Sequence, residues 1–386
     1  MLPVTFSRVF RMPLYEGIGL TEKQAVVIDI GAAYTKFGFA GESGPRCIIQ
    51  TEVKCPETKQ VKKVLHYSSK EDLYDLLVEF IHNLYFRHLL VSPKDRRVVI
   101  VESLLCPTLF RETLAKVLFR HFEVSSVLFV PSHLVSLCTL GVNTAVILDV
   151  GYIEAVLIPV FEGVPVLHAW QAQPRAAEAV ESSLKALLLS HNNDKEDFPE
   201  SAIEDIKVRT CFVTSLERAL QLETVEPPPD VVYREGGTKI FNIPGKVREA
   251  VYEVLFEQDN DQISISTMIL DAIIKCPIDM RKPLAENILV MGGTAMAPGF
   301  KARLLGELKY LLQQPKYSSR LALKTFKFHK PPAKENYVAW LGGAIFGGTD
   351  MISTRSLTKE AYLKHNNVPD WADLSYNCRE EDKISL

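Results

Sequence analysis

Short apolar runs and longer amphipathic stripes alternate along most of the chain. Runs rich in β-branched residues predict strands at 25–30, 36–40, 98–104, 127–130, 145–149, 155–161 and 287–291. Apolar residues at helical spacing predict helices at 110–122, 133–140, 263–275, 300–312 and 338–346, and a more polar helical region at 174–204. This alternation predicts an α/β fold in which helices cover sheets.

Polar and proline-rich segments separate these elements. The lysine-rich stretch 52–63 has little to pack and predicts a solvated loop, and we expect 191–197 to be a surface loop and 226–230 to be extended. Ser69, with Asp72 three positions later, is typical of the N-terminal cap of a further helix. The apolar positions of that helix continue to Leu84.

Both ends of the chain are poorer in packing residues. Arg8 and Arg11 interrupt any apolar core of a secretory signal, so we expect 1–23 to be a disordered extension. Translation could equally begin at Met12. After Met351 the chain turns polar, and the residues expected to anchor it are Tyr362, Trp371 and Tyr376.

Charge and cysteine usage narrow the function classes. The net charge of −3 and a pI near 6.3 do not favour nucleic acid or an anionic membrane as partner. The seven cysteines are scattered without a Cys-x-x-Cys pair, which predicts reduced cytoplasmic thiols and no structural zinc. Acidic residues interrupt the longest apolar region, 144–167, so we expect no membrane span.

A weak internal repeat is the most informative feature. The run Val26–Gly31 (VVIDIG) is echoed 120 positions later by Val146–Gly151 (VILDVG), and a second strand follows each run. Tight turns with glycine expose backbone N–H groups that bind phosphate oxygens, and two such turns could clamp one triphosphate. Asp29 and Asp149, at the strand ends, could hold Mg²⁺ directly or through water, although one such aspartate alone is more often a structural cap.

Several motifs resemble the actin family in the same order along the chain. The segment 29–41 resembles the first phosphate-binding hairpin of actin, with Lys36 at the position of the lysine that reaches the phosphates. Further segments that resemble actin are 148–151, 274–282, 291–299 and 336–343. The resemblance covers most of the chain between about residues 25 and 350.

This resemblance implies the two-lobed fold that actin shares with Hsp70 chaperones and hexokinases. The implied subdomains are subdomain 1 at 24–46, 70–139 and 335–386, a strongly reduced subdomain 2 at 47–69, subdomain 3 at 140–174 and 261–334, and subdomain 4 at 175–260. The implied cofactor is ATP or ADP with Mg²⁺ in a structural role.

The resemblance also implies which residues would bind that cofactor. The nucleotide-binding positions are Gly31, Ala32, Ala33, Tyr34, Lys36, Gly151, Tyr152, Ile153, Lys207, Gly292, Gly293, Thr294, Met296 and Asn336, and the metal positions are Asp29 and Asp149, through water. Ala32 replaces the serine that bonds the terminal phosphate in actin, and Val208 replaces an acidic residue beside the adenosine. Both changes remove contacts without removing the clamp.

The residues that activate water in actin are replaced here. Ser132, Tyr152 and Val156 stand at the positions of its glutamine, aspartate and histidine. Since such groups contribute about 10²–10⁴-fold each, we expect no catalytic residues and negligible hydrolysis. Tyr152 could shield a bound nucleotide or fill its place, and we favour a bound nucleotide.

A second departure is a deletion. Between Gly41 and Ser69, actin carries a full small subdomain that inserts into the next filament subunit, and only a short stretch remains here. A subunit without it can end a filament but poorly extend it. The runs 46–49, 100–103, 256–260 and 369–371 are similar to those of actin-related subunits at the pointed end of dynactin.

That resemblance implies a non-catalytic cytoplasmic subunit that caps the pointed end of the short dynactin filament and supports dynein-driven transport on microtubules. Its implied partners are the terminal actin or actin-like subunit, the other pointed-end subunits and, indirectly, dynein, with no nucleic acid or membrane. The barbed-end face would lie near Gly141, Val142 and 342–346.

Two other functions stay open at this point. One is an actin-related subunit of a nuclear chromatin-remodelling complex, against which the lack of a basic cluster argues. The other is an active ATPase or sugar-kinase relative, for which Glu154 is the only nearby acid.

Overall fold

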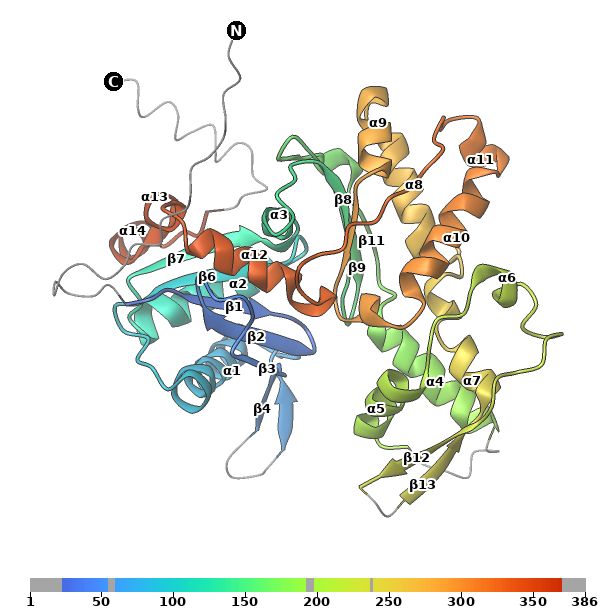
Figure 1. The fold of residues 1–386 in the computed structure, drawn as a ribbon. Helices are drawn as coiled ribbons and strands as arrows, with labels where there is room; N and C mark the ends of the chain where they lie inside the picture. The colour runs from blue at the N-terminus through green and yellow to red at the C-terminus, as the bar shows by residue number, and fades with distance from the viewer. Residues whose placement is uncertain (1–22, 55–59, 192–197, 237–238, 370–386) are drawn as a thin grey trace, which may run out of the picture.

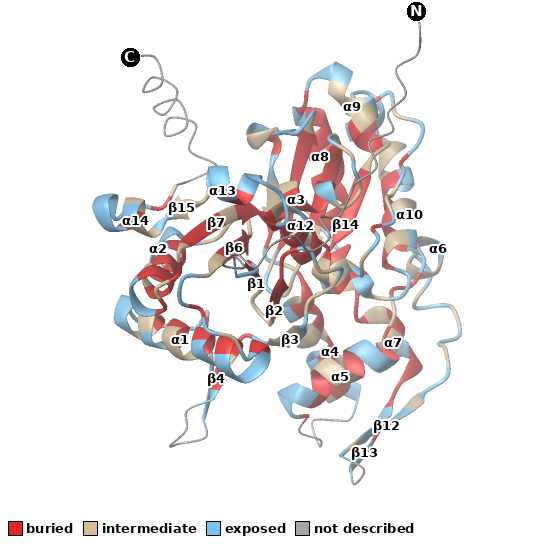
Figure 2. Cartoon of the chain, turned by 60° about the vertical axis from the view of Figure 1, so that its left-hand side comes forward, coloured by how far each residue is buried: buried red, intermediate tan, exposed pale blue. Residues whose placement is uncertain are grey.

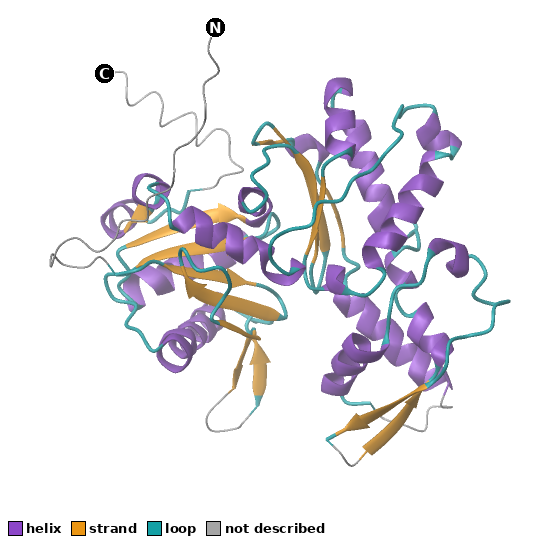
Figure 3. Cartoon of the chain, in the orientation of Figure 1, coloured by secondary structure: helices purple, strands orange, loops and turns teal. Residues whose placement is uncertain are grey.

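A computed structural model describes residues 23–54, 60–191, 198–236 and 239–369. Each of two lobes contains one sheet, and helices α3 (Ser132–Cys138) and α12 (Val338–Gly347) lie where the lobes join (Figure 1). Helices pack around both sheets, and two small hairpins extend away from them (Figure 3). Residues 1–22 of the expected N-terminal extension and the tail anchors Trp371 and Tyr376 lie outside the described residues.

The first lobe is built on a six-stranded sheet. Its order is β15 (Leu357–Thr358), β7 (Ser126–Pro131), β6 (Arg97–Glu102), β1 (Val26–Ile30), β2 (Tyr34–Phe39) and β3 (Cys47–Gln50). Side chains alternate along β1, so Val26 packs with helices α1 (Lys70–Asn83) and α2 (Thr108–Lys116), whereas Val27 packs with α12 (Val338–Gly347). The sheet is therefore covered on both faces.

The second lobe has a five-stranded sheet. Its order is β10 (Val164–Pro165), β9 (Ala155–Phe161), β8 (Ala145–Val150) and β14 (Ile288–Met291), with β11 (Gln171–Gln173) also paired to β9. The helices of this lobe include α8 (Ile265–Lys275), α9 (Ile278–Ala285), α10 (Phe300–Leu312) and α11 (Pro315–Ser318). The end of the lobe beyond the sheet holds α4 (Ala177–His191), α5 (Glu200–Thr210), α6 (Leu216–Ala219), α7 (Gly245–Ala250) and the hairpin of β12 (Val231–Glu235) and β13 (Lys239–Ile243). Buried residues follow both sheets, and exposed ones lie on the hairpins and outer helices (Figure 2).

The internal repeat is confirmed residue by residue. Asp29 pairs with Lys36 across β1 and β2, and Asp149 pairs with Val156 across β8 and β9, so both pairs keep the spacing of 120 positions. Each first strand also pairs in parallel with a second neighbour, β6 for β1 and β14 for β8. The two lobes thus share one central motif, as the actin-like fold predicts.

A glycine lets helices α12 and α3 pack closely at the join between the lobes. A Cβ atom at Gly342 of α12 would lie 2.1 Å from the carbonyl oxygen of Val135 in α3 (Ser132–Cys138). Trp340 is fully buried and its Nε1 donates to the carbonyl of Val27 at 3.1 Å. Beyond α13 (Met351–Arg355), Tyr362 on α14 (Lys359–His365) stacks on Phe119 at 4.6 Å, which confirms one of the expected tail anchors.

Three local predictions need correction. The stretch 52–63 is not simply a solvated loop, because β4 (Glu52–Lys54) and β5 (Val61–Lys63) pair as a hairpin around 55–59, which lie outside the described residues. Val53 packs into the core of the first lobe and is only 3% exposed, so it anchors the hairpin there. The region 174–204 splits into α4 and α5, and 110–122 leaves α-helical geometry for a π-helical turn at Val117–His121.

The cap at Ser69 is confirmed, because the Asp72 N–H donates to its Oγ at 3.1 Å. Within the described ranges, every helix is too short or too polar to cross a bilayer.

Candidate functional site

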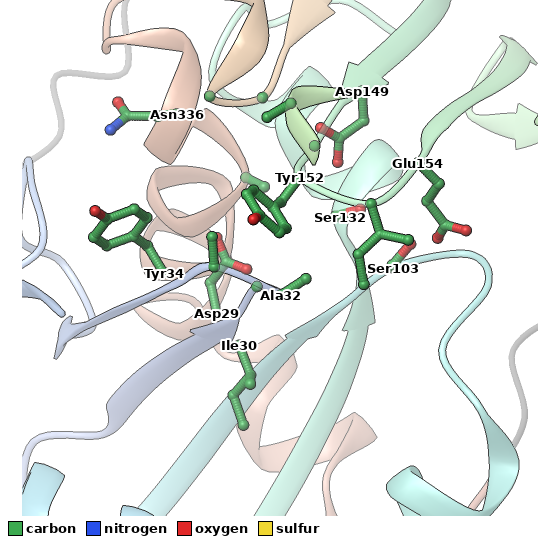
Figure 4. A pocket seen from close by; sticks show the side chains of 18 of the residues that line it. Asp29, Ile30, Ala32, Tyr34, Ser103, Ser132, Asp149, Tyr152, Glu154 and Asn336 are labelled. Carbon is green, nitrogen blue, oxygen red and sulfur yellow. The ribbon is translucent and has the colours of Figure 1, made fainter. Parts of the chain in front are cut away.

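A cleft of about 740 Å³ lies between the lobes. Its lining includes all of the residues predicted to bind nucleotide or metal, and the three positions predicted to have lost catalytic side chains. Figure 4 shows Tyr152 between Asp149 and the turn that carries Asp29 and Ala32. The fold thus brings the predicted residues together, while their individual roles stay predictions. The lining also includes Phe110 and Phe129, which lie on α2 and β7 of the first lobe.

The two Asp-x-Gly turns are closed by the same hydrogen bond. The Gly31 N–H donates to the carbonyl of Tyr34 at 3.2 Å, and the Gly151 N–H donates to the carbonyl of Glu154 at 3.1 Å. These two glycine N–H groups are therefore occupied, so any N–H groups that the turns present to a phosphate belong to the residues that follow the glycines. The residues that follow them, Ala32 among them, line the cleft.

Thr51 supports the first turn and was not singled out from the sequence. Its hydroxyl donates to the carbonyl of Gly31 at 2.7 Å, and its N–H donates to the carbonyl of Ala33 at 2.8 Å. Since Thr51 lies about 20 positions after the turn, no local pattern marks this role. Only the pairing of β2 with β3 brings it into place.

The charged groups of the cleft interact with one another. Lys36 Nζ lies 3.3 Å from Asp29 Oδ2. Desolvation raises the pKa of Asp149 to about 6, with smaller contributions from Lys36, which lowers it, and from Asp29 and Glu154, which raise it. Among the described residues, no three His, Cys, Asp or Glu side chains form a group that could hold a metal ion alone. A metal at these aspartates would need oxygen atoms from a ligand or water.

The loop after β14 packs directly on the second turn. Gly292 has φ +96°, and a Cβ atom there would lie 2.2 Å from the carbonyl oxygen of Val150 and 2.6 Å from Asp149 Oδ1. Thr294 Oγ1 donates to the carbonyl of Gly151 at 2.6 Å. A Cβ atom at Gly293, in contrast, would meet nothing in the described chain within 4 Å apart from its chain neighbours, so it would enter open space. The first glycine serves packing, and the second leaves room in the cleft.

Two of the three positions predicted to have lost actin's catalytic side chains, Ser132 and Tyr152, hold groups with partners inside the protein. Ser132 is buried and its Oγ lies 3.1 Å from Nδ1 of His133. His133 was not considered from the sequence, although it neighbours one of these positions. Burial lowers its pKa to about 4, and its Nε2 faces the carbonyl of Val156 at 3.4 Å. This imidazole is neutral at pH 7 and lies against the backbone of β9.

Tyr152 and Lys207 share a partner on α4. The Tyr152 hydroxyl donates to Glu181 Oε2 at 2.9 Å, and Lys207 Nζ donates to Glu181 Oε1 at 2.5 Å. Tyr34 in turn donates to Glu204 on α5. The sequence did not single out either glutamate. The Tyr152 ring forms a wall of the cleft and leaves a volume within the range of about 300–1,000 Å³ usual for ligand pockets.

Comparison with known proteins assigns the family. The actin family model matches residues 20–73, 71–226 and 198–368. The chain is 27% identical to actin-related protein 10 of Dictyostelium discoideum, over 92% of this chain and 90% of that protein. It is 25% identical to putative actin-29 of the same organism, over 89% of this chain and 95% of that protein. The two matching lobes, the repeated Asp-x-Gly turns and these similarities together show that the chain belongs to the actin family.

Proposed function

We propose that this chain is a non-catalytic actin-related subunit of dynactin that caps the pointed end of its short actin-like filament and supports dynein-driven transport on microtubules. The observation that carries the proposal is the small β4–β5 hairpin where actin has a full subdomain. Between Gly41 and α1 the described chain forms only β3 and this hairpin. Such a subunit can bind a neighbouring subunit on one face, but on its other face it has little to insert into a further subunit.

The two faces then have different partners. The barbed-end face, near Gly141, Val142 and the end of α12, would contact the terminal actin or actin-like subunit. The reduced pointed face would contact the other pointed-end subunits of dynactin. The protein would be cytoplasmic and associated with microtubules through dynein. The four-subdomain division given above is part of the same proposal.

The residues of the cleft fit ATP or ADP with Mg²⁺. Gly293 leaves open space, and the Oδ1 atom of Asn336 is buried without a hydrogen-bond partner among the described residues. Asp29 and Asp149 would hold the metal through water, and Lys36 would neutralise phosphate charge. When bound, the nucleotide would supply negative charge and contacts to both lobes, which stabilises their closed arrangement.

We expect hydrolysis to be negligible. The Ser132 hydroxyl lies beside His133, the Tyr152 hydroxyl is bound to Glu181, and Val156 has an aliphatic side chain. The neighbouring His133 is buried and neutral. Phosphate release from Mg²⁺·ATP should be at least about 100-fold slower than that of an actin filament control. A single-turnover assay with radiolabelled ATP measures this rate, and release at the rate of actin would favour the active-ATPase alternative.

Affinity purification of the tagged protein from cells tests the assignment to dynactin. We expect dynactin subunits to co-purify, and intact nucleotide to be recovered after denaturation of the complex. Chromatin-remodelling subunits in place of dynactin would contradict the proposal. As a control, extending the β4–β5 hairpin with an actin-like subdomain should leave the barbed-end partner bound and displace the pointed-end partners.

Nucleotide affinity should rise with pH between about pH 5 and 7. Because the pKa of Asp149 is about 6, this carboxyl group is protonated in more than half of the molecules below pH 6. The neutral acid is a poor partner for Mg²⁺. We expect up to about a tenfold loss of affinity per pH unit below 6. The effect of this group on folding has the opposite sign, since its folded pKa lies above its unfolded one and stability falls as pH rises from 4 to 6.

Fluorescence titrations with Mg²⁺·ATP over this pH range measure the slope. Titration of the nucleotide's own phosphate is common to the wild type and Asp149→Asn, so it cancels in their comparison. Equal slopes for the two proteins would rule out Asp149 as the titrating group.

A further inference from the structure

Tyr34 links the two lobes directly. It lies at the start of β2 in the first lobe, and its hydroxyl donates to Glu204 Oε1 on α5 of the second lobe at 2.7 Å. Its backbone is held by pairing with Gln50 on β3. Hydrogen bonds to an ionised carboxylate are stronger than those between neutral groups. One lobe thus offers a rigidly placed donor and the other a charged acceptor.

Tyr152 forms a second link, in which the tyrosine belongs to the second lobe and its partner to the first. It lies in the turn between β8 and β9 of the second lobe, and its hydroxyl binds Glu181, whose other oxygen accepts from Lys207. These contacts orient the ring within its own lobe. The ammonium of Lys63, on β5 of the first lobe, then lies 5.6 Å from the centre of the ring, within reach of a cation–π interaction. The small hairpin therefore touches the second lobe through this lysine.

Both links lie away from the segments that join the lobes. The join is at α3 and α12, whereas Glu204 and Glu181 are on α5 and α4, which lie with the β4–β5 hairpin at the end of the molecule away from the join (Figure 1). Opening about the join would separate groups at this end the most. Contacts placed there resist opening more effectively than contacts near the join.

We propose that Tyr34 and Tyr152 are positioning residues that latch the lobes closed without help from a ligand. The latch consists of the Tyr34–Glu204 hydrogen bond and the Lys63–Tyr152 contact, with Glu181 and Lys207 orienting the Tyr152 ring. The interlobe angle is then set by the chain itself, as a permanent filament end requires. A second consequence, slow nucleotide release, rests on the proposed nucleotide site.

Single-molecule fluorescence transfer on the nucleotide-free protein tests the latch. Dyes are placed through non-canonical residues at Lys70 on α1 and Ile240 on β13, which are both exposed and lie in different lobes. We expect the wild type to be closed and the Tyr34→Phe/Lys63→Gln variant, which removes one group from each contact, to shift most molecules to a longer distance. Tyr34→Phe removes a hydroxyl and keeps the ring, and Lys63 is only half-buried, so the cores are undisturbed.

Matched variants separate a latch from a general effect on folding. Tyr310→Phe removes an exposed hydroxyl on α10 and should leave the distance unchanged. Glu204→Gln keeps an acceptor oxygen and should retain the closed state, whereas Glu204→Ala should open it. Hydrogen exchange within each lobe should be the same in all of these proteins. If the substituted residues only stabilised their own lobes, exchange within those lobes would instead become faster.

The remaining outcomes also decide between the proposals. We expect the double variant to release a fluorescent ATP analogue, loaded with Mg²⁺, at least about tenfold faster than the wild type. An open wild type without nucleotide, or an unchanged distance in the double variant, would overturn the latch. If the analogue does not bind the wild type but the distance still shifts, the latch stands and the proposed nucleotide site fails.

Discussion

Replacing Arg303 by methionine is expected to destabilise the second lobe by about 3–5 kcal/mol, the range typical for breaking a buried charge network. The guanidinium is only 4% exposed. It donates to both oxygens of Glu253 at 2.7 and 2.6 Å and to Glu307 Oε1 at 2.8 Å. Removing the cation leaves two carboxylates close together and largely out of water, so the cost exceeds that of the lost hydrogen bonds.

Denaturant unfolding of the purified chain measures this cost as a shift of the midpoint. Arg209→Met is the matched control, because Arg209 also pairs with an acid, Asp205, but is 70% exposed. Exposed pairs of this kind contribute at most about 1 kcal/mol. Equal shifts for the two variants would show that burial of the Arg303 network has no special effect on stability.

The adjacent glycines of the cleft loop should respond in opposite ways to alanine. Gly292→Ala places a Cβ atom 2.2 Å from the Val150 carbonyl at a φ of +96°. We expect this combined strain and clash to cost about 2–5 kcal/mol of stability. Gly293→Ala enters open space at a helical φ of −64°, so stability should change by no more than about 0.5 kcal/mol.

Gly293→Ala should affect nucleotide binding although it leaves stability almost unchanged. Gly293→Ala narrows the predicted nucleotide side of the cleft, so we expect at least about a tenfold weaker affinity, or about 1.4 kcal/mol, for Mg²⁺·ATP. Thermal unfolding with and without Mg²⁺·ATP measures stability and binding in one experiment. A Gly293→Ala protein that binds as tightly as the wild type would remove this glycine from the proposed site.

The cleft shows how far local patterns reach. The echo of Asp29 and Asp149 predicted two equivalent hairpins, and their cross-strand pairs share the same offset. The residues predicted for the site also line one cleft. The hydrogen bonds of the two glycine N–H groups could not be predicted. They depend on the backbone dihedral angles of each turn, which bring the carbonyl three residues later within reach.

The alternation of β-branched runs and helical stripes determined the fold class by itself, since residues that alternate with period 2 or 3.6 bury one face wherever the chain later packs. The cap at Ser69 was equally local. The tertiary structure alone decided the partners of the cleft residues. Tyr34 meets Glu204 from 170 positions away, and Val53 turns an apparently solvated stretch into a packed hairpin. Such contacts depend on how distant segments meet, and no spacing along the chain records that.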